Sequence, residues 1–191
     1  IILNLTLTLD GFIEGPNGEI DWIVGDSSID FGDILNEIIR DKDAIFYGRK
    51  SYELWGNYSP EQGSQKLKDA YALMHTKTKY VFSETKTSDG TNAIFINKNI
   101  KQRVEEIKQS RNSWRKNIWL YGGAGLITTF LNLDLIDEFH LAIQPVILGK
   151  GKPLFQNIEQ RHKLKLLETK GDPSGVTLLI YETDRTKTIK N

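Results

Sequence analysis

Hydrophobic and polar residues alternate from the first residues of the chain. Leucine occupies every second position from residue 3 to residue 9, and Asn or Thr stands between the leucines. This period of two is typical of a β-strand with one buried face. Asp10-Gly11 and the stretch Gly15-Pro16-Asn17-Gly18 then supply residues that favour turns. The chain is therefore predicted to open with a strand that ends in tight turns.

The pattern then changes to helical spacing. Apolar residues at positions 31, 34, 35, 38 and 39 fall on one face of a helix, with Ser27 or Ser28 as its N-cap. A second helix is predicted to begin at Ser59, because proline follows at the first helical position and glutamine at the third. Apolar stripes predict two more helices, at residues 100–107 and 126–131.

Short apolar runs between these helices predict strands at residues 44–48, 80–83, 93–96, 118–121 and 139–143. Two final strands, at 164–166 and 176–181, are joined by a turn-forming stretch and form a hairpin. Strands that alternate with helices, followed by closing antiparallel strands, predict an α/β fold with a mostly parallel sheet and an antiparallel C-terminal edge. We expect a single domain over residues 1–183 and a polar tail over 184–191.

The amino-acid composition argues against several classes of function and partner. The 191 residues include 25 Lys and Arg against 25 Asp and Glu, and a net charge of zero argues against a nucleic-acid partner. The absence of cysteine excludes disulfides, thiolate nucleophiles and cysteine-ligated metals. No apolar run approaches the roughly 18 residues of a membrane helix. We expect a cytoplasmic protein with no membrane partner.

A glycine turn is the strongest chemical signal. Gly122-Gly123-Ala124-Gly125 follows Tyr121 and joins a predicted strand to a predicted helix, where backbone N–H groups and the helix dipole favour phosphate. The alternative is a tight turn that only packs the helix on the sheet. The stretch nearly matches a dinucleotide fingerprint, but residues 144–148 lack the acid that a Rossmann fold needs.

A second junction of strand and turn, Gly48-Arg49-Lys50-Ser51, carries two cations beside a hydroxyl. Such a group suits a phosphate ester, although a solvated turn has the same composition. The three histidines have no metal-binding spacing, so no metal site is expected. Acidic residues near these strands are interpreted mainly as caps or turn formers; they are Asp10, Asp26, Asp30 and Asp33.

With these motifs assembled, the chain resembles the dihydrofolate-reductase-like superfamily. More specifically, it is similar to the family of the C-terminal reductase domain of bacterial bifunctional riboflavin-biosynthesis deaminase–reductases, as a stand-alone relative. The segments that carry the resemblance span most of the chain: Thr8 to Ile13, Gly48 to Glu53, Tyr121 to Phe139 and Pro145 to Gly151.

The resemblance implies a three-layer fold with helices on both faces of the sheet and NADPH across the strand ends. Residues 122–127 would hold the pyrophosphate, with a cis peptide between the paired glycines, and Ser83 would lie near the 2′-phosphate. Residues 7–10 and Trp22 would border the nicotinamide. The implied cofactor-binding residues are Leu7, Thr8, Trp22, Arg49, Lys50, Ser51, Ser83, Gly122, Gly123, Ala124, Gly125, Leu126 and Ile127.

Two positions depart from the family pattern. Tyr121 replaces the glutamate that commonly precedes the paired glycines in the riboflavin reductases. Glu84 follows Ser83 where many dihydrofolate reductases have a basic residue, which weakens the preference for NADPH over NADH. The candidates for proton donor are Tyr121, Asp30 and ordered water.

The expected function is an NADPH-dependent reductase. It would transfer a hydride to a C=N or C=O carbon of a small heterocyclic or sugar-linked substrate, as in 5-amino-6-(5-phosphoribosylamino)uracil reductase. The alternatives are a dihydrofolate-reductase-type pterin reductase and a non-catalytic sensor that binds NADPH, a pterin or a flavin. The resemblance also implies a homodimer, for which the apolar strand at residues 141–148 is a candidate surface.

Overall fold

The computed structural model describes residues 1–23, 30–110 and 117–186. Eight strands form one sheet in the order β5-β4-β3-β6-β1-β7-β10-β9, and β2 pairs with β8 in a small second sheet. The strands are β1 (Ile2–Thr8), β2 (Phe12–Glu14), β3 (Lys42–Gly48), β4 (Thr78–Phe82), β5 (Ile94–Ile96), β6 (Asn117–Gly122), β7 (Glu138–Gln144), β8 (Lys152–Pro153), β9 (Leu164–Gly171) and β10 (Thr177–Thr183).

The large sheet is mixed. Strands β5, β4, β3, β6, β1 and β7 are parallel to one another. β10 runs antiparallel to both β7 and β9. This arrangement confirms the predicted mostly parallel sheet with an antiparallel C-terminal edge. Because parallel strands end at the same edge, the segments that follow β1, β3, β4 and β6 are brought together there.

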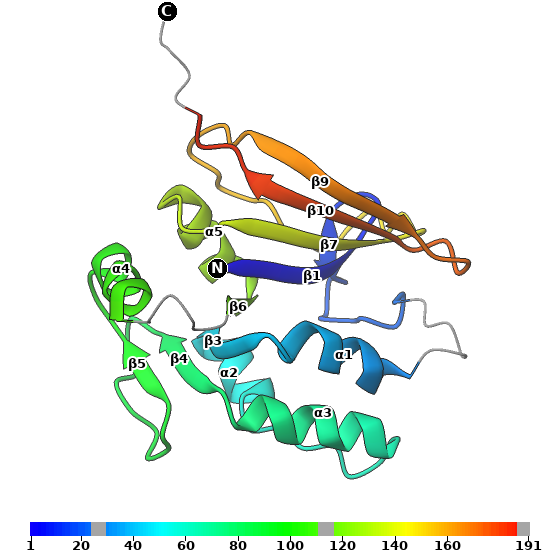
Figure 1. Cartoon of the computed structure of the whole chain (residues 1–191). Coiled ribbons are helices and arrows are strands. Elements are labelled where there is room, and N and C mark those ends of the chain that lie inside the picture. The colour runs from blue at the N-terminus through cyan, green and yellow to red at the C-terminus, as the bar shows by residue number, and fades with distance from the viewer. Residues whose placement is uncertain (24–29, 111–116, 187–191) are drawn as a thin grey trace, which may run out of the picture.

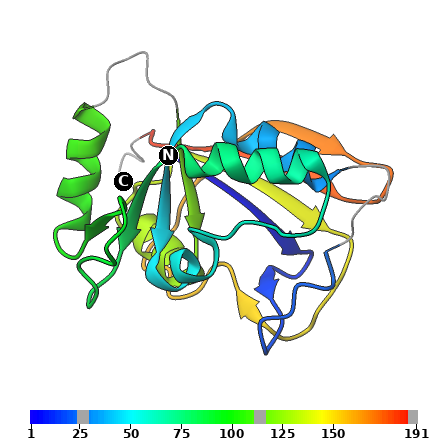
Figure 2. The ribbon, with the colours of Figure 1, turned by 90° about the horizontal axis from the view of Figure 1, so that it is seen from below.

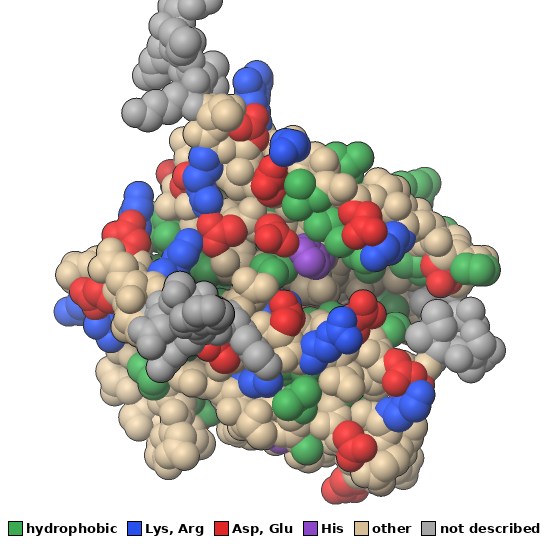
Figure 3. Space-filling view, viewed as in Figure 1, with side chains coloured by type: hydrophobic (Ala, Val, Ile, Leu, Met, Phe, Trp, Pro, Cys, Tyr) green, Lys and Arg blue, Asp and Glu red, His purple; other side chains and the backbone are tan. Residues whose placement is uncertain are grey.

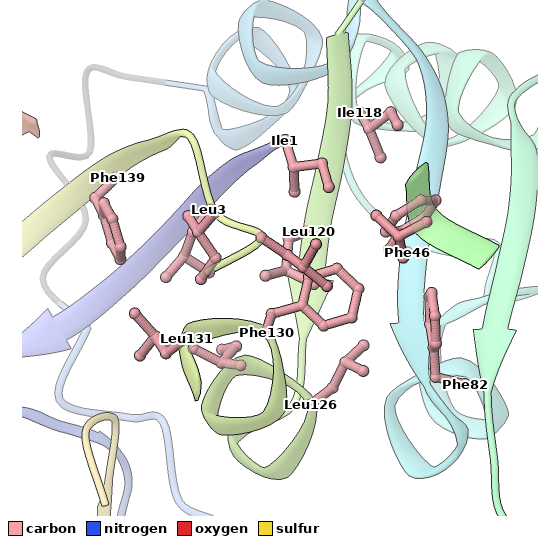
Figure 4. Packing of buried hydrophobic residues seen from close by; sticks show 14 of the residues in the cluster. Ile1, Leu3, Phe46, Phe82, Ile118, Leu120, Leu126, Phe130, Leu131 and Phe139 are labelled. Atoms are coloured by element: carbon pink, nitrogen blue, oxygen red, sulfur yellow. The ribbon is translucent and has the colours of Figure 1, made fainter. Parts of the chain in front are cut away.

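Helices cover both faces of part of the sheet (Figures 1 and 2). The helices are α1 (Phe31–Ile39), α2 (Arg49–Trp55), α3 (Gln65–His75), α4 (Ile100–Ser110) and α5 (Ala124–Asn132). One buried cluster joins α4 and α5 to the sheet, and Phe130 of α5 packs there against Phe46 and Phe82 (Figure 4). A second cluster joins α1, α2 and α3 to the opposite face of β3, β4 and β6.

The start of α1 differs from the prediction. Its N-cap is Asp30, whose carboxylate accepts a hydrogen bond from the N–H of Gly32 at 2.8 Å; Ser27 and Ser28 lie outside the described residues. The apolar stripe is also wider than the buried face. Leu35 and Ile39 are buried, whereas Phe31 is 57% exposed and Ile34 is 42% exposed.

The prediction that a helix begins at Ser59 is wrong. Helix α3 begins at Gln65, and its N-cap Ser64 accepts a hydrogen bond from the N–H of Leu67 at 3.0 Å. Gly63 has a φ of +117°, which no helix can accommodate. The sequence holds two capping signals five residues apart, and this backbone conformation selects the second.

The C-terminal segment continues past β10. Arg185 Nη1 lies 2.9 Å from the carboxylate of Asp137, so the first residues after position 183 contact the domain. Residues 187–191 of the expected tail lie outside the described residues. Within the described part of the chain, no helix is long and apolar enough to cross a membrane.

Replacing Phe130 by Ala is expected to lower the free energy of unfolding by about 3–5 kcal/mol, because the ring is fully buried among aromatic neighbours. Phe31→Ala removes the same atoms from an exposed site and serves as the matched control, with an expected change below about 0.5 kcal/mol. Urea unfolding of both variants measures the difference. Equal losses of unfolding free energy for the two variants would show that the side chains between α5 and the sheet do not form the main core.

Candidate functional site

Strands β3 and β6 lie side by side and end in glycine at the same edge of the sheet. Tyr47 pairs with Gly122, so Gly48 reaches the edge next to the paired glycines. A Cβ atom on Gly48 would lie 3.4 Å from the carbonyl oxygen of Gly122. The two chain segments therefore approach with backbone against backbone.

Helix α5 presents its N-terminus at this edge. Its N-cap, Gly123, has no side chain to cap the first turn, and Gly122 and Gly123 are joined by a cis peptide bond, as the resemblance implies. The first helical backbone bond runs from the N–H of Ile127 to the carbonyl of Gly123, so the N–H groups of residues 124–126 have no partner within the helix. A Cβ on Gly125 would meet open space, which leaves room for an anion to approach.

Ser51 links helix α2 to the glycine turn. Its Oγ accepts a hydrogen bond from the N–H of Gly123 at 2.8 Å. A Cβ on Gly123 would come within 3.1 Å of the same oxygen, so a larger residue here would crowd this hydroxyl. The two strand-to-turn motifs, which are 72 residues apart in sequence, form one continuous site.

Positive charge gathers on the β4 side of this site. Arg49 pairs with Glu53 at 2.8 Å, and Lys86 lies 3.5 Å from the other oxygen of the same carboxylate. The hydrogen bond from Arg49 lowers the pKa of Glu53 below its ordinary value. Lys50 is exposed beside them. Two cations thus share one anion, and Lys50 adds a third positive charge next to Arg49 in the sequence, which leaves a net positive group.

The turn after β4 completes this group. Gly48 pairs with Phe82, so Ser83 follows at the same edge as Arg49. The Oγ of Ser83 accepts from the N–H of Lys86 at 2.9 Å, while Asn97 donates to the carbonyl oxygens of both residues. The sequence reasoning missed Lys86 and Asn97, because neither belongs to a recognisable motif; only their distance from Ser83 in the fold reveals them.

Several implied cofactor residues contribute backbone rather than side chains. Leu7, Ala124, Leu126 and Ile127 are buried in the cluster beneath α5. Thr8 is fully buried, and its Oγ1 accepts from the N–H of Phe12 at 2.9 Å. These side chains hold the edge in place, and their role at a cofactor stays a prediction.

Trp22 lies in the segment between β2 and α1. Its indole N–H donates to the carbonyl oxygen of Glu19 at 3.0 Å, and the ring is only half-buried. The structure shows no hydrogen bond from this indole to β1 among the described residues, so its place at the nicotinamide stays a prediction.

Asp10 ties two distant segments together. Thr8 Oγ1 donates to its carboxylate at 2.6 Å, and the backbone N–H of Gly149 donates to the other oxygen at 2.7 Å. The hydrogen bond from Thr8, followed by the backbone bonds from residues 148 and 149, lowers the pKa of Asp10. This carboxylate therefore positions the loop after β7, in keeping with its interpretation as a turn former.

Tyr121 stands in an aromatic group at the carboxyl end of β6. Its ring centroid lies 4.9 Å from that of Tyr47 and 5.0 Å from that of Trp119. Burial raises the pKa of the Tyr121 hydroxyl above its ordinary value, so the phenol stays protonated near neutral pH. A protonated phenol can donate a hydrogen bond to a substrate heteroatom.

The pKa of Asp30 is shifted in the opposite direction from that of Tyr121. Its carboxylate caps α1, and hydrogen bonds, first from Ser64 and then from the N–H of Gly32, lower its pKa. It is therefore ionised at neutral pH and has no proton to give. Of the two side chains considered as proton donors, only Tyr121 carries a proton at neutral pH, and its role in a reaction stays a prediction. Within the described ranges, no three His, Asp or Glu residues form a group that could hold a metal ion.

The three-layer arrangement is the dihydrofolate-reductase-like fold. The dihydrofolate reductase of Enterococcus faecalis, solved with NADP(H), matches with a TM-score of 0.60 at 13% identity, over 96% of this chain and 95% of that one. A Shewanella sp. PV-4 protein named "Putative riboflavin biosynthesis protein" matches with a TM-score of 0.75 at 20% identity, over 96% of this chain and 98% of that one.

Sequence comparison then shows the family. Residues 1–178 match the RibD C-terminal domain, and the chain belongs to this family. The protein YyaP of Bacillus subtilis (strain 168) is 51% identical over 182 residues, which are 95% of this chain and 93% of YyaP. The family is one of NADPH-dependent reductases.

Tyr47 and Tyr52 pack in the aromatic group around Tyr121, and a matched pair of substitutions tests the hydrogen bonding of their hydroxyls. The hydroxyl of Tyr47 is buried with no hydrogen-bond partner among the described residues, whereas that of Tyr52 lies 3.0 Å from Thr91 Oγ1. Tyr47→Phe is expected to raise the free energy of unfolding by about 1 kcal/mol, and Tyr52→Phe to lower it by about 1 kcal/mol. Denaturant unfolding measures both, and a loss for Tyr47→Phe would reveal a partner for its hydroxyl.

Proposed function

We propose that this protein is an NADPH-dependent reductase that acts on a C=N or C=O group of a small heterocyclic or sugar-linked substrate. The observation that carries the proposal is the single edge of the sheet at which the N-terminus of α5 lies beside the turns that carry Arg49 and Lys86, with Lys50 exposed next to Arg49 in the sequence. A dinucleotide with an additional phosphate requires both features.

The residues present fit this cofactor. The N–H groups of residues 124–126 suit the pyrophosphate, since the glycines leave the approach clear. Arg49, Lys50 and Lys86 suit a 2′-phosphate, with Glu53 holding the first and last of these in place. When bound, reduced nicotinamide supplies a hydride, which is a proton with two electrons.

The remaining chemistry falls to the chain itself. The carbon of the C=N or C=O group gains the hydride, its heteroatom gains one proton, and the products are an amine or alcohol and NADP⁺. Tyr121 keeps its proton and orients the heteroatom by donating a hydrogen bond, and water delivers the proton that is consumed. The backbone at the end of β1, held by Thr8 and Asp10, fixes the distance between the reacting carbons.

Titration with NADPH and NADH tests the cofactor. Arg49→Ala and Lys50→Ala are each expected to weaken NADPH about tenfold and NADH by less than twofold, because only NADPH carries the extra phosphate. Lys68→Ala, an exposed cation on α3, is the control and should change neither. Equal losses for the two nucleotides would contradict the phosphate role, and no binding of either would overturn the proposal. Binding without oxidation of NADPH across pterin and aminouracil substrates would favour a sensor.

We also propose a homodimer, with its surface on β10 and β9. Of the strand at residues 141–148, Leu141 is buried whereas Ile147 is 72% exposed, and its place in an interface stays a prediction. In contrast, Leu178 and Ile180 share the face of β10 that α1 and α3 leave uncovered. Leu166 and Leu167 of β9 are also exposed, although Leu166 pairs with Tyr181 and therefore lies on the other face of the sheet. Figure 3 shows hydrophobic side chains gathered over this part of the molecule.

Light scattering tests the oligomeric state. The protein is expected to have twice the mass of one chain, and the double variant Leu178→Arg/Ile180→Arg is expected to be monomeric, because two cations would be buried without partners. Ile94→Arg on the opposite edge strand β5 is the control. A monomeric parent protein would contradict the proposal.

A further inference from the structure

We infer that the substrate of this protein is an uncharged or positively charged, largely apolar compound that carries no phosphate or carboxylate. The inference rests on the proposed reductase function and narrows its substrate class. Arg49, Lys50 and Lys86, the cations of the proposed cofactor site, lie on α2 and on the turn after β4. The proposed substrate side is formed by other elements, and their charge is negative.

Acidic and basic residues are distributed unevenly along the sequence. Residues 1–39 contain eight Asp and Glu and no Lys, Arg or His, although the whole chain has equal numbers of acids and bases. The described residues 1–23 and 30–39 hold seven of these eight carboxylates, and they form β1, β2, the start of the segment after β2 and helix α1. These elements gather at one side of the molecule, where β1 ends and α1 begins (Figures 1 and 2). This is the side at which the proposed function places the nicotinamide and the reducible group.

The wall of this region contributed by α1 is apolar. A Cβ on Gly32 would collide with the backbone of Lys66 and Leu67, so the Gly32 side of α1 faces α3. Phe31 and Ile34 lie on the other flank of the buried stripe, at helical angles beyond Leu35, and so face away from α3. In Figure 1, α1 lies between α3 and β1, so this exposed flank is turned toward β1. Two large apolar side chains are thus exposed on the flank of α1 opposite α3.

Further apolar residues are exposed on the neighbouring segments. Leu9 directly follows β1, and Ile20 and Ile23 lie between β2 and α1; all three are exposed. Exposed apolar side chains on several segments at one sheet edge are typical of a ligand site. On the other face of β1 from Leu3, Leu5 and Leu7, the side chains of Asn4 and Thr6 are partly exposed and offer hydrogen bonds without charge.

Cations near this region are already paired with carboxylates. Lys66 pairs with Asp33 at 2.6 Å, and Lys152 with Glu14 at 3.2 Å. The hydrogen bond from Asn17 is the main cause that lowers the pKa of Glu19, and the positive charge of Lys150 adds to it. His140, on the open face of β7, is held by Glu138 at 2.9 Å.

Carboxylates therefore outnumber the cations around the substrate side. Asp30 remains ionised at the N-cap of α1, and Glu37 lies one turn beyond Asp33. The nearest cation after them along the chain is Arg40, at the opposite end of the helix. An anionic substrate would meet repulsion here and find no free described cation on α1, β1 or β2 to receive its phosphate.

A matched set of aldehydes tests the charge preference. Methyl 4-formylbenzoate is neutral, 4-carboxybenzaldehyde is its anionic counterpart, and 4-formyl-N,N,N-trimethylanilinium is cationic. Affinity for the protein saturated with NADP⁺ is measured by calorimetry, so the result does not depend on turnover. The neutral and cationic members are expected to bind about tenfold more tightly than the carboxylate, and salt is expected to reduce the difference.

A second pair tests phosphate directly. 5-Amino-6-(ribosylamino)uracil and its 5′-phosphate share the same reducible centre, and the unphosphorylated compound is expected to bind more tightly. A preference for the phosphate or the carboxylate, or no binding by any compound to the NADP⁺ complex, would overturn the inference alone. Failure of NADP⁺ itself to bind would overturn the proposed function, and the inference with it.

Variants of α1 locate the effect. Phe31→Ala and Ile34→Ala are expected to weaken the neutral ester about fivefold while NADP⁺ affinity stays unchanged. Phe31→Lys is expected to reduce the discrimination against the carboxylate. Ile94→Ala removes an exposed apolar side chain from β5 and is the control. Equal effects at residues 31 and 94 would show that the α1 flank does not line the substrate site.

Discussion

The site depends on the close approach of two strand ends that both consist of glycine. Gly48 and Gly122 end neighbouring parallel strands, and the hydrogen bond from the N–H of Gly123 to Ser51 Oγ joins the segments that follow. A Cβ on Gly122 would lie 2.9 Å from Ile127, at a φ of +101° that only glycine adopts readily. Because the backbone itself forms this surface, α5 presents its N–H groups to solvent rather than to a neighbouring side chain.

The sheet and its chemistry were largely predictable because their signals are local. Alternation identified β1, and the glycine stretch after Tyr121 identified the junction of β6 with α5. Capping was harder to predict, because Ser59 and Ser64 both suit a helix start and only the backbone at Gly63 decides between them. The strands β2 and β8 were missed, since each is too short to show a period.

Some residues of the candidate site could be predicted from the sequence, whereas others are revealed only by the fold. Arg49, Lys50 and Ser51 could be proposed from composition beside a strand end, and the structure brings them to the glycine turn. Lys86 depends on the parallel pairing of β3 with β4, which no spacing in the sequence reveals. The exposure of Phe31 was equally hidden, because hydrophobic periodicity cannot distinguish an apolar flank that packs from one that is left open.

The bonds that Asp10 accepts from residues 148 and 149 have a consequence for folding. They close a loop of almost 140 residues, so the substrate side is assembled from the two ends of the domain, whereas α1 and α3 meet within the first 75 residues. Contacts this distant in sequence form late, because their loop-closure entropy must be offset by other contacts. During synthesis, the region beside β1 therefore stays incomplete until the loop after β7 has emerged, long after the strands that carry the cations.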